Sequence, residues 1–93
     1  MSEPTAERCY STPDHVFVRE VGDEIVLLNT LTETYHGLDG IGRRCFEQLS
    51  AGRSINQVAA RLSGEFDVSV ETLSRDLSSL VDELVEADLL RTV

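Results

Sequence analysis

The fold is decided by the stretch HVFVREVGDEIVLLN, residues 15–29. Two runs rich in β-branched and other apolar residues, His15–Glu20 and Glu24–Asn29, flank a Gly-Asp turn. This pattern predicts a β-hairpin. Because residues 25–28 are all apolar, we expect the second strand to be covered on both faces, or to present one face as a docking surface.

A third strand is predicted directly after the hairpin, over Thr32–His36, and it ends at Gly37. Period-two spacing divides this region into two faces: one takes Leu31, Glu33 and Tyr35, and the other takes Thr32, Thr34 and His36. If strands that follow one another in the chain are also neighbours in the sheet, as in a β-meander, this third strand lies at the edge of the sheet. It contains no Pro and a single charged residue, so it is poorly protected against pairing with another chain.

Helical signals fill the rest of the chain. Asp39 is a candidate N-cap for a first helix, which we expect to end before Gly52. Ser54 opens an S-x-x-Q capping box for a second helix. We expect that helix to break at Gly64–Asp67, which gives a turn over Ser63–Val68 longer than the ~3–4 residues of a tight helix-turn-helix.

A third helix is predicted to begin after an N-cap at Asp67 or Ser69. The apolar stripe of this helix is wider than a single packing contact needs. The helix can therefore pack against the rest of the domain and still expose apolar side chains along one flank. The stripe consists of Val70, Leu73, Leu77, Leu80, Val81, Leu84 and Val85.

The order of strands before helices predicts a single α+β domain. It is a winged helix-turn-helix-like fold, with a three-stranded antiparallel sheet followed by three helices. Within the 93 residues, we expect residues 1–14 to form a flexible N-terminal tail, with Tyr10 able to attach its end to the body. Residues 15–93 are expected to form the domain.

The charge balance narrows the choice of partners. The chain has 17 acidic and 8 basic residues, all of the latter Arg, and a net charge of −9. Such a surface argues against nucleic acid and anionic membranes as partners. No apolar run approaches the ~20 residues of a membrane span, the N-terminus has no secretory pattern, and Cys9 and Cys45 form no CxxC motif. We therefore expect a cytoplasmic protein with free thiols.

Catalytic signals are missing from the sequence. His15 and His36 fall in or beside predicted strands, no common catalytic motif is present, and no residues have metal-ligand spacing. Cys45 sits at a core-facing helical position, where it behaves as a small hydrophobe. We expect no enzymatic activity and no cofactor.

Two functions other than catalysis, DNA binding and peptide binding, remain open when the sequence pattern alone is considered. The topology is shared with winged-helix DNA-binding regulators, in which a helix of this kind reads the DNA. The predicted third helix, however, carries one basic residue, Arg75, and several carboxylates, which the phosphates of DNA would repel. The edge strand can accept a peptide by β-augmentation, in which the peptide adds a strand and pockets read its alternate side chains. The alternative is that the N-terminal tail or a second copy covers this edge.

Several motifs, in this order, resemble the PqqD-like family, the recognition elements of ribosomally synthesised and modified peptides. They are YHGLDGIG at residues 35–42, FEQLSAG at 46–52, FDV at 66–68 followed by Asp76, and the closing pair Leu89-Leu90. The resemblance spans residues 15–90 and is closest to the stand-alone members of lasso peptide clusters. Asp88 stands where the family usually has Gly.

The resemblance implies a non-catalytic adaptor. It would bind the leader of a precursor peptide as an added strand and present it to a separate leader peptidase and a cyclase. The alternative within the family is the PqqD protein of quinone-cofactor synthesis, which delivers its peptide to a radical enzyme. The implied edge is Leu31, Thr32, Glu33, Thr34 and Tyr35, and the implied anchor pocket is lined by Leu28 and Tyr35. Asp76 would accept a hydrogen bond from the leader, flanked by Leu73, Leu77 and Leu80.

Overall fold

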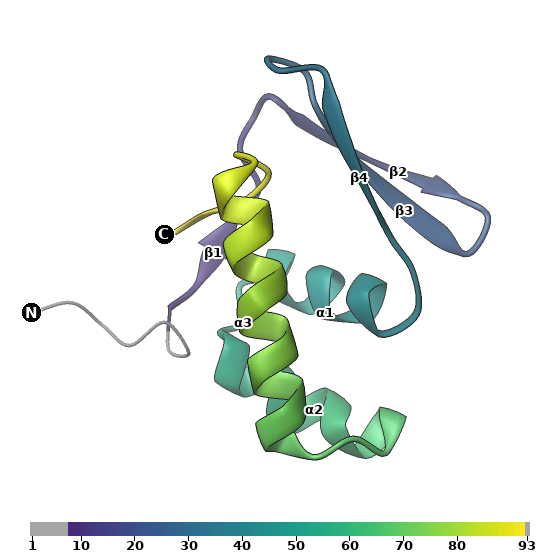
Figure 1. The fold of residues 1–93 in the computed structure, drawn as a ribbon, viewed down its shortest axis with the longest axis vertical. Coiled ribbons are helices and arrows are strands. Elements are labelled where there is room, and N and C mark those ends of the chain that lie inside the picture. The colour runs from purple at the N-terminus through teal and green to yellow at the C-terminus, as the bar shows by residue number, and fades with distance from the viewer. Residues whose placement is uncertain (1–7, 93) are drawn as a thin grey trace, which may run out of the picture.

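The computed structural model describes residues 8–92 and shows a small sheet beside three helices (Figure 1). The sheet contains β2 (Val16–Val21), β3 (Glu24–Asn29) and β4 (Thr34–Leu38), all antiparallel, with β3 in the centre. The helices are α1 (Gly40–Ser50), α2 (Ile55–Phe66) and α3 (Val70–Glu86). Two short strands, β1 (Tyr10–Ser11) and β5 (Arg91–Thr92), pair near the chain ends. The predicted α+β fold, with three antiparallel strands followed by three helices, is confirmed.

The β2–β3 hairpin forms where the sequence predicts it. Gly22 has a φ of 63° and opens a two-residue turn that pairs Val21 with Glu24. Only glycine takes this conformation at no steric cost, which explains the Gly-Asp sequence of the turn.

The predicted third strand is displaced. We expected Thr32–His36, but Thr30 to Glu33 form a turn and β4 runs from Thr34 to Leu38. The side chain of Asn29 accepts hydrogen bonds from the backbone N–H groups of Leu31 and Thr32, and Glu33 adopts a left-handed φ of 62°. This Asx turn overrides the β propensity of the threonines.

The helix ends follow their capping signals. Ser54 forms the predicted capping box with Gln57, and the Ser69 hydroxyl accepts from the N–H of Thr72 at the start of α3. Asp39 occupies the N-cap position of α1 without a side-chain capping bond. Gly52 follows α1 with a φ of 97°, as a glycine at this position is expected to do.

The predicted break in α2 is wrong. The helix continues through Gly64 to Phe66, and Asp67 caps its end with a left-handed φ of 52°. Asp67, Val68 and Ser69 alone connect α2 to α3, which is the tight helix-turn-helix connection. A solvent-exposed Gly in a helix costs only about 1 kcal/mol relative to Ala, so Gly64 did not end the helix.

One face of the sheet packs on the helices and encloses the core. Residues from all major elements are buried there: Val16, Ile25, Leu27, Leu38, Cys45, Phe46, Leu49, Ile55, Val58, Leu62, Leu73, Leu77, Val81, Leu84, Leu89 and Leu90. The opposite face of the sheet, hereafter the outer face, does not contact the helices.

The segment around Tyr10 packs on the body of the protein. Residues 1–7 of the expected tail lie outside the described residues. Tyr10, in β1, is buried against the core and pairs with Thr92 of β5. Its aromatic ring gains enough apolar contact to attach this segment to the body, and its burial raises the pKa of the Tyr10 hydroxyl.

Candidate functional site

The outer edge of β4 carries backbone groups without a partner strand. Within residues 8–92, β4 pairs with β3 alone. The tight turn makes Val21 and Glu24 a hydrogen-bonded pair, and antiparallel pairs alternate from there. Leu27–His36 and Ile25–Leu38 are therefore hydrogen-bonded pairs. The N–H and C=O groups of Tyr35 and Gly37 point away from the sheet, where an added strand can pair with them.

A small apolar pocket lies between α1 and α3, with a volume of about 270 Å³. It is lined by Ile41, Gly42, Cys45, Val68, Leu73, Asp76, Leu77 and Leu80. This volume is slightly below the ~300–1,000 Å³ of typical ligand pockets, so it suits one or two side chains rather than a whole small molecule. We call it the α1–α3 pocket.

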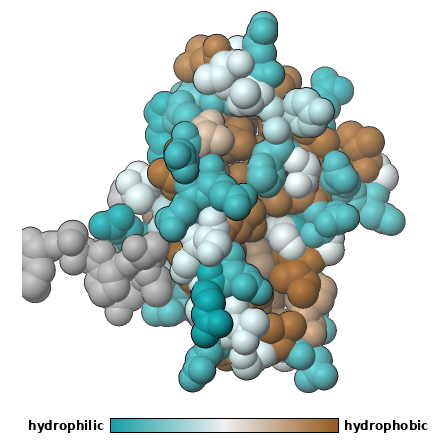
Figure 2. All heavy atoms as spheres, viewed as in Figure 1, coloured by the Kyte–Doolittle hydropathy of each residue, from teal (hydrophilic) through white to brown (hydrophobic). Residues whose placement is uncertain are grey.

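The lining of the α1–α3 pocket is apolar except for one carboxylate. Leu73 and Leu77 are buried and form its floor, Leu80 is half-buried, and Asp76 is exposed at its rim. Figure 2 shows hydrophobic atoms reaching the surface beside α3, between hydrophilic side chains. The pocket can therefore hold an apolar side chain and offer one charged hydrogen-bond acceptor.

The free edge and the α1–α3 pocket adjoin each other. α1 starts two residues after β4 ends, and its first turn contributes Ile41 and Gly42 to the pocket. β4 and α3 run in opposite directions, so the turn before β4 lies near the C-terminal end of α3 (Figure 1). A peptide paired with β4 would therefore pass the α3 side of the molecule and reach the pocket at the end of the strand.

A second apolar surface covers the outer face of the sheet. It forms a shallow depression of about 420 Å³ lined by Phe17, Val18, Arg19, Val21, Val26, Leu28 and Tyr35. Phe17 is 60% exposed and Tyr35 76% exposed. Exposed apolar groups that gather in one patch indicate an interaction surface.

The residues predicted from the sequence fall into three groups. Two lie on the outer face, Leu28 and Tyr35. Four line the α1–α3 pocket, Leu73, Asp76, Leu77 and Leu80. Four surround the start of β4: Leu31, Thr32 and Glu33 in the turn, and Thr34 as the first residue of the strand. The structure thus places Leu28 and Tyr35 apart from the α3 residues, on the other side of the sheet.

Three site features were missing from the sequence prediction. Ile41 and Val68 complete the α1–α3 pocket, and Phe17 dominates the outer face. The adjacent apolar residues Val16-Phe17-Val18 were a signal for a two-sided apolar strand, but they could equally indicate a strand that is covered on both faces. Gly37, rather than Thr32, belongs to the open edge.

The thiol of Cys45 lines part of the α1–α3 pocket. Burial raises the pKa of the Cys45 thiol to about 11, so this side chain remains a neutral thiol near pH 7. Among residues 8–92, no cluster of three or more His, Cys, Asp or Glu side chains could hold a metal ion. The same described part of the chain contains no helix long and apolar enough to cross a membrane.

Comparison with known proteins adds a family and two structures. The family described as "Coenzyme PQQ synthesis protein D (PqqD)" matches residues 24–90. The structure "TbiB1 in Complex with the TbiA(beta) Leader Peptide" is 32% identical with a TM-score of 0.80, and the match covers 87% of this chain and 94% of that one. No protein of curated function matches at a significant level.

A second solved structure, "Lasso peptide synthetase B1 complexed with the leader peptide", has a TM-score of 0.82. Its identity is 24%, and the match covers 88% of this chain and 96% of that chain. At this identity the likeness concerns the fold alone. Both of these relatives were solved with a leader peptide bound.

Proposed function

The chain belongs to the PqqD family, whose profile matches residues 24–90, and from this premise we propose that it binds the leader segment of a ribosomally made precursor peptide. The leader adds an antiparallel strand to β4 and places an anchoring side chain in the α1–α3 pocket. The adjacency of a free strand edge to an apolar pocket carries this proposal. The 32% identical TbiB1, solved with a leader peptide, supports it.

The two parts of this site supply different kinds of interaction. The edge groups of Tyr35 and Gly37 hydrogen-bond any peptide main chain, so they give affinity without sequence preference. The α1–α3 pocket reads a side chain, and the Asp76 carboxylate at its rim accepts a hydrogen bond from the leader. A flexible leader loses ~2–5 kcal/mol on ordering. Buried anchors in the pocket therefore have to supply much of the net affinity.

We assign the outer face to the enzyme that processes the precursor. A leader paired with β4 extends the sheet by one strand, so its alternate side chains continue the apolar surface around Phe17, Leu28 and Tyr35. An enzyme that docks on this face contacts the leader and the adaptor together. In a lasso pathway that enzyme is the leader peptidase, with a cyclase acting afterwards. The adaptor itself is non-catalytic and works in the cytoplasm.

A titration of the ¹⁵N-labelled chain tests the leader-binding function. The probes are the TbiA(beta) leader peptide and synthetic leaders from short reading frames beside this gene, with a DNA duplex as a control. We expect saturating shifts at residues 34–38 of β4 and around Asp76 with at least one leader, and none with DNA. Shifts with DNA alone, or none with any leader, would refute the proposal.

A further inference from the structure

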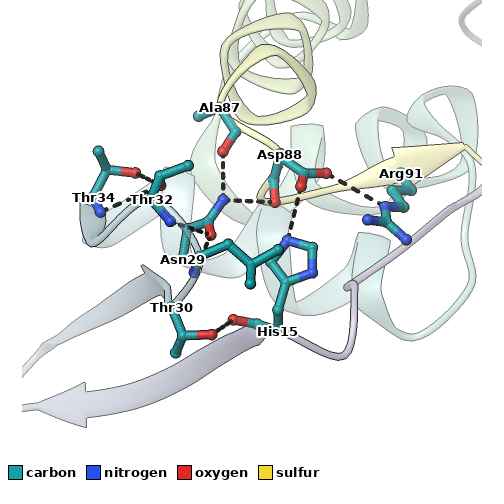
Figure 3. Close-up of polar contacts among 9 residues, drawn as sticks. His15, Asn29, Thr30, Thr32, Thr34, Ala87, Asp88 and Arg91 are labelled. Atoms are coloured by element: carbon teal, nitrogen blue, oxygen red, sulfur yellow. Dashed lines mark hydrogen bonds and ion pairs between the residues drawn. The ribbon is translucent and has the colours of Figure 1, made fainter.

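A single buried side chain joins the end of β3 to the end of α3. Asn29 is fully buried, and its Nδ2 group donates to the carbonyl oxygens of Ala87 at 3.0 Å and Asp88 at 3.3 Å (Figure 3). Its Oδ1 atom accepts from the N–H groups of Leu31 at 2.9 Å and Thr32 at 3.2 Å. Both donors and the acceptor of the carboxamide are therefore in use.

These bonds connect the two walls of the proposed leader site. Leu31 and Thr32 belong to the turn that leads into β4, and Ala87 follows the last residue of α3. The last carbonyl groups of a helix have no partner within it, so Asn29 caps α3 from the sheet. Within residues 8–92, the hydrogen bonds between residues 29–34 and the end of α3 all come from Asn29.

Neighbouring contacts brace the same junction. His15 Nε2 lies 2.8 Å from Asp88 Oδ2, and the backbone oxygen of His15 accepts from the N–H and the hydroxyl of Thr30. Asp88 Oδ1 lies 3.4 Å from Arg91 Nε. Asp88 also has a left-handed φ of 56°, which favours glycine, and yet its carboxylate is placed between His15 and Arg91 (Figure 3).

We propose that Asn29 is a positioning residue: its carboxamide sets the separation and alignment of β4 and α3, so that one leader reaches the free edge and the α1–α3 pocket together. This inference rests on the proposed leader-binding function. The other end of β4 is held by the short connection to α1, so Asn29 secures the end that would otherwise swing. A site with fixed walls needs less ordering when the peptide binds.

Asn29→Ser tests the inference without adding a charge. The serine hydroxyl can still accept from the turn, but it is too short to reach the carbonyl of Ala87. Asn29→Asp is the second variant. It keeps the size of the side chain and the Oδ1 acceptor, but it replaces the Nδ2 donor with an oxygen. Ser54→Ala is the matched control, since among residues 8–92 Ser54 is the other buried polar residue, and it caps α2 away from the leader site.

Each full-length ¹⁵N-labelled variant is titrated with the TbiA(beta) leader peptide, or with a neighbouring leader that binds the wild type, at a temperature where all are folded. We expect Asn29→Ser to bind at least 10-fold more weakly, whereas Ser54→Ala binds like the wild type. At saturation, Asn29→Ser should keep shifts around Asp76 but lose amide protection at Tyr35 and Gly37. Wild-type affinity, or an equal loss at edge and pocket, would overturn the inference.

A measurement on the wild type covers the case in which neither variant folds. The Asn29 carboxamide protons and the N–H groups of Leu31 and Thr32 should exchange slowly in the free protein and remain unchanged when the leader binds. Fast exchange in the free protein would show that the junction does not fix the site in advance, and would overturn the inference. A wild-type protein that binds no leader contradicts the proposed function, while this exchange test of the junction still stands.

Discussion

Leu28 and Tyr35 stand directly opposite each other across β3 and β4, and both side chains are exposed on the outer face of the sheet. They therefore cannot share a pocket with Asp76, which lies on the other side of the sheet between α1 and α3. The chain presents two apolar surfaces, one on each side of the strand that would pair with a leader. Substitutions on the two surfaces should have separable effects.

The first prediction concerns the outer face. Phe17→Ser and Val21→Ser should slow leader removal by the cognate peptidase about 10-fold, because each removes exposed apolar surface from the docking face. The affinity for the leader should not change. Val85→Ser is the matched control, since Val85 is also exposed but lies on α3. Peptidase kinetics beside leader titrations check this, and an equal loss in both assays would contradict it.

The second prediction concerns the edge of β4. The amides of Tyr35 and Gly37 should exchange rapidly in the free chain and slowly when a leader is bound, because an added strand hydrogen-bonds them. The amides of His36 and Leu38 already pair with β3 and should be protected in both states. Hydrogen exchange followed by NMR checks this alternation. Protection of all four amides in the free chain would mean that the edge is already covered.

The third prediction concerns the rim of the α1–α3 pocket. Asp76→Ala should weaken leader binding by about 10-fold or more, because a hydrogen bond to a charged group contributes ~1.5–3 kcal/mol. Asp76→Asn keeps an acceptor and should lose less. Asp76 is exposed, so neither change should lower the free energy of unfolding appreciably.

Asp82→Asn is the control for this series. Asp82 is exposed on the same helix and is not among the residues that line the α1–α3 pocket. It should leave leader affinity unchanged. If Asp76→Ala and Asp82→Asn have equal effects, the general charge of α3 governs binding and the assigned hydrogen bond does not exist.

The sequence predicted the fold well because its signals were local. The Gly-Asp turn, the capping box at Ser54 and the apolar period of α3 each depend on a few neighbouring residues. The limits of β4 were missed because the Asx turn at Asn29, although its own bonds are local, is formed by a side chain that a long-range contact also holds. Asn29 binds the carbonyl groups of Ala87 and Asp88, and at the same time it bends the chain at Leu31 and Thr32.

The site could be predicted only in part for a related reason. Helical spacing brought Leu73, Asp76, Leu77 and Leu80 together, and the structure places them in one pocket. Spacing along the chain could not determine which side of the sheet Leu28 and Tyr35 would take relative to that pocket. The side depends on which face of β3 meets the helices, and β3 is apolar on both faces.

The last prediction concerns pH and the thiol at the base of the α1–α3 pocket. Burial raises the pKa of Cys45 from 9.0 to about 11, because the folded protein disfavours the thiolate. Because the pKa is raised in the folded state only, the buried neutral thiol contributes to the free energy of unfolding. This contribution of Cys45 is fully present below pH 9. The contribution is lost as the pH rises from about 9 to about 11, because Cys45 ionises in the unfolded chain first and this ionisation stabilises the unfolded state.

The Cys45→Ala variant has no ionisable group at this position. Other groups that ionise at high pH, such as Tyr10, affect the variant and the wild type equally, so the difference in their stability reports on Cys45. Urea unfolding between pH 8 and pH 11 should show the stability advantage of the wild type over Cys45→Ala shrinking with rising pH. A constant difference across that range would mean that Cys45 ionises in the folded protein as readily as in the unfolded chain. The thiol would then be open to solvent, and the wall of the α1–α3 pocket at Cys45 would be more hydrated than the burial of this side chain indicates.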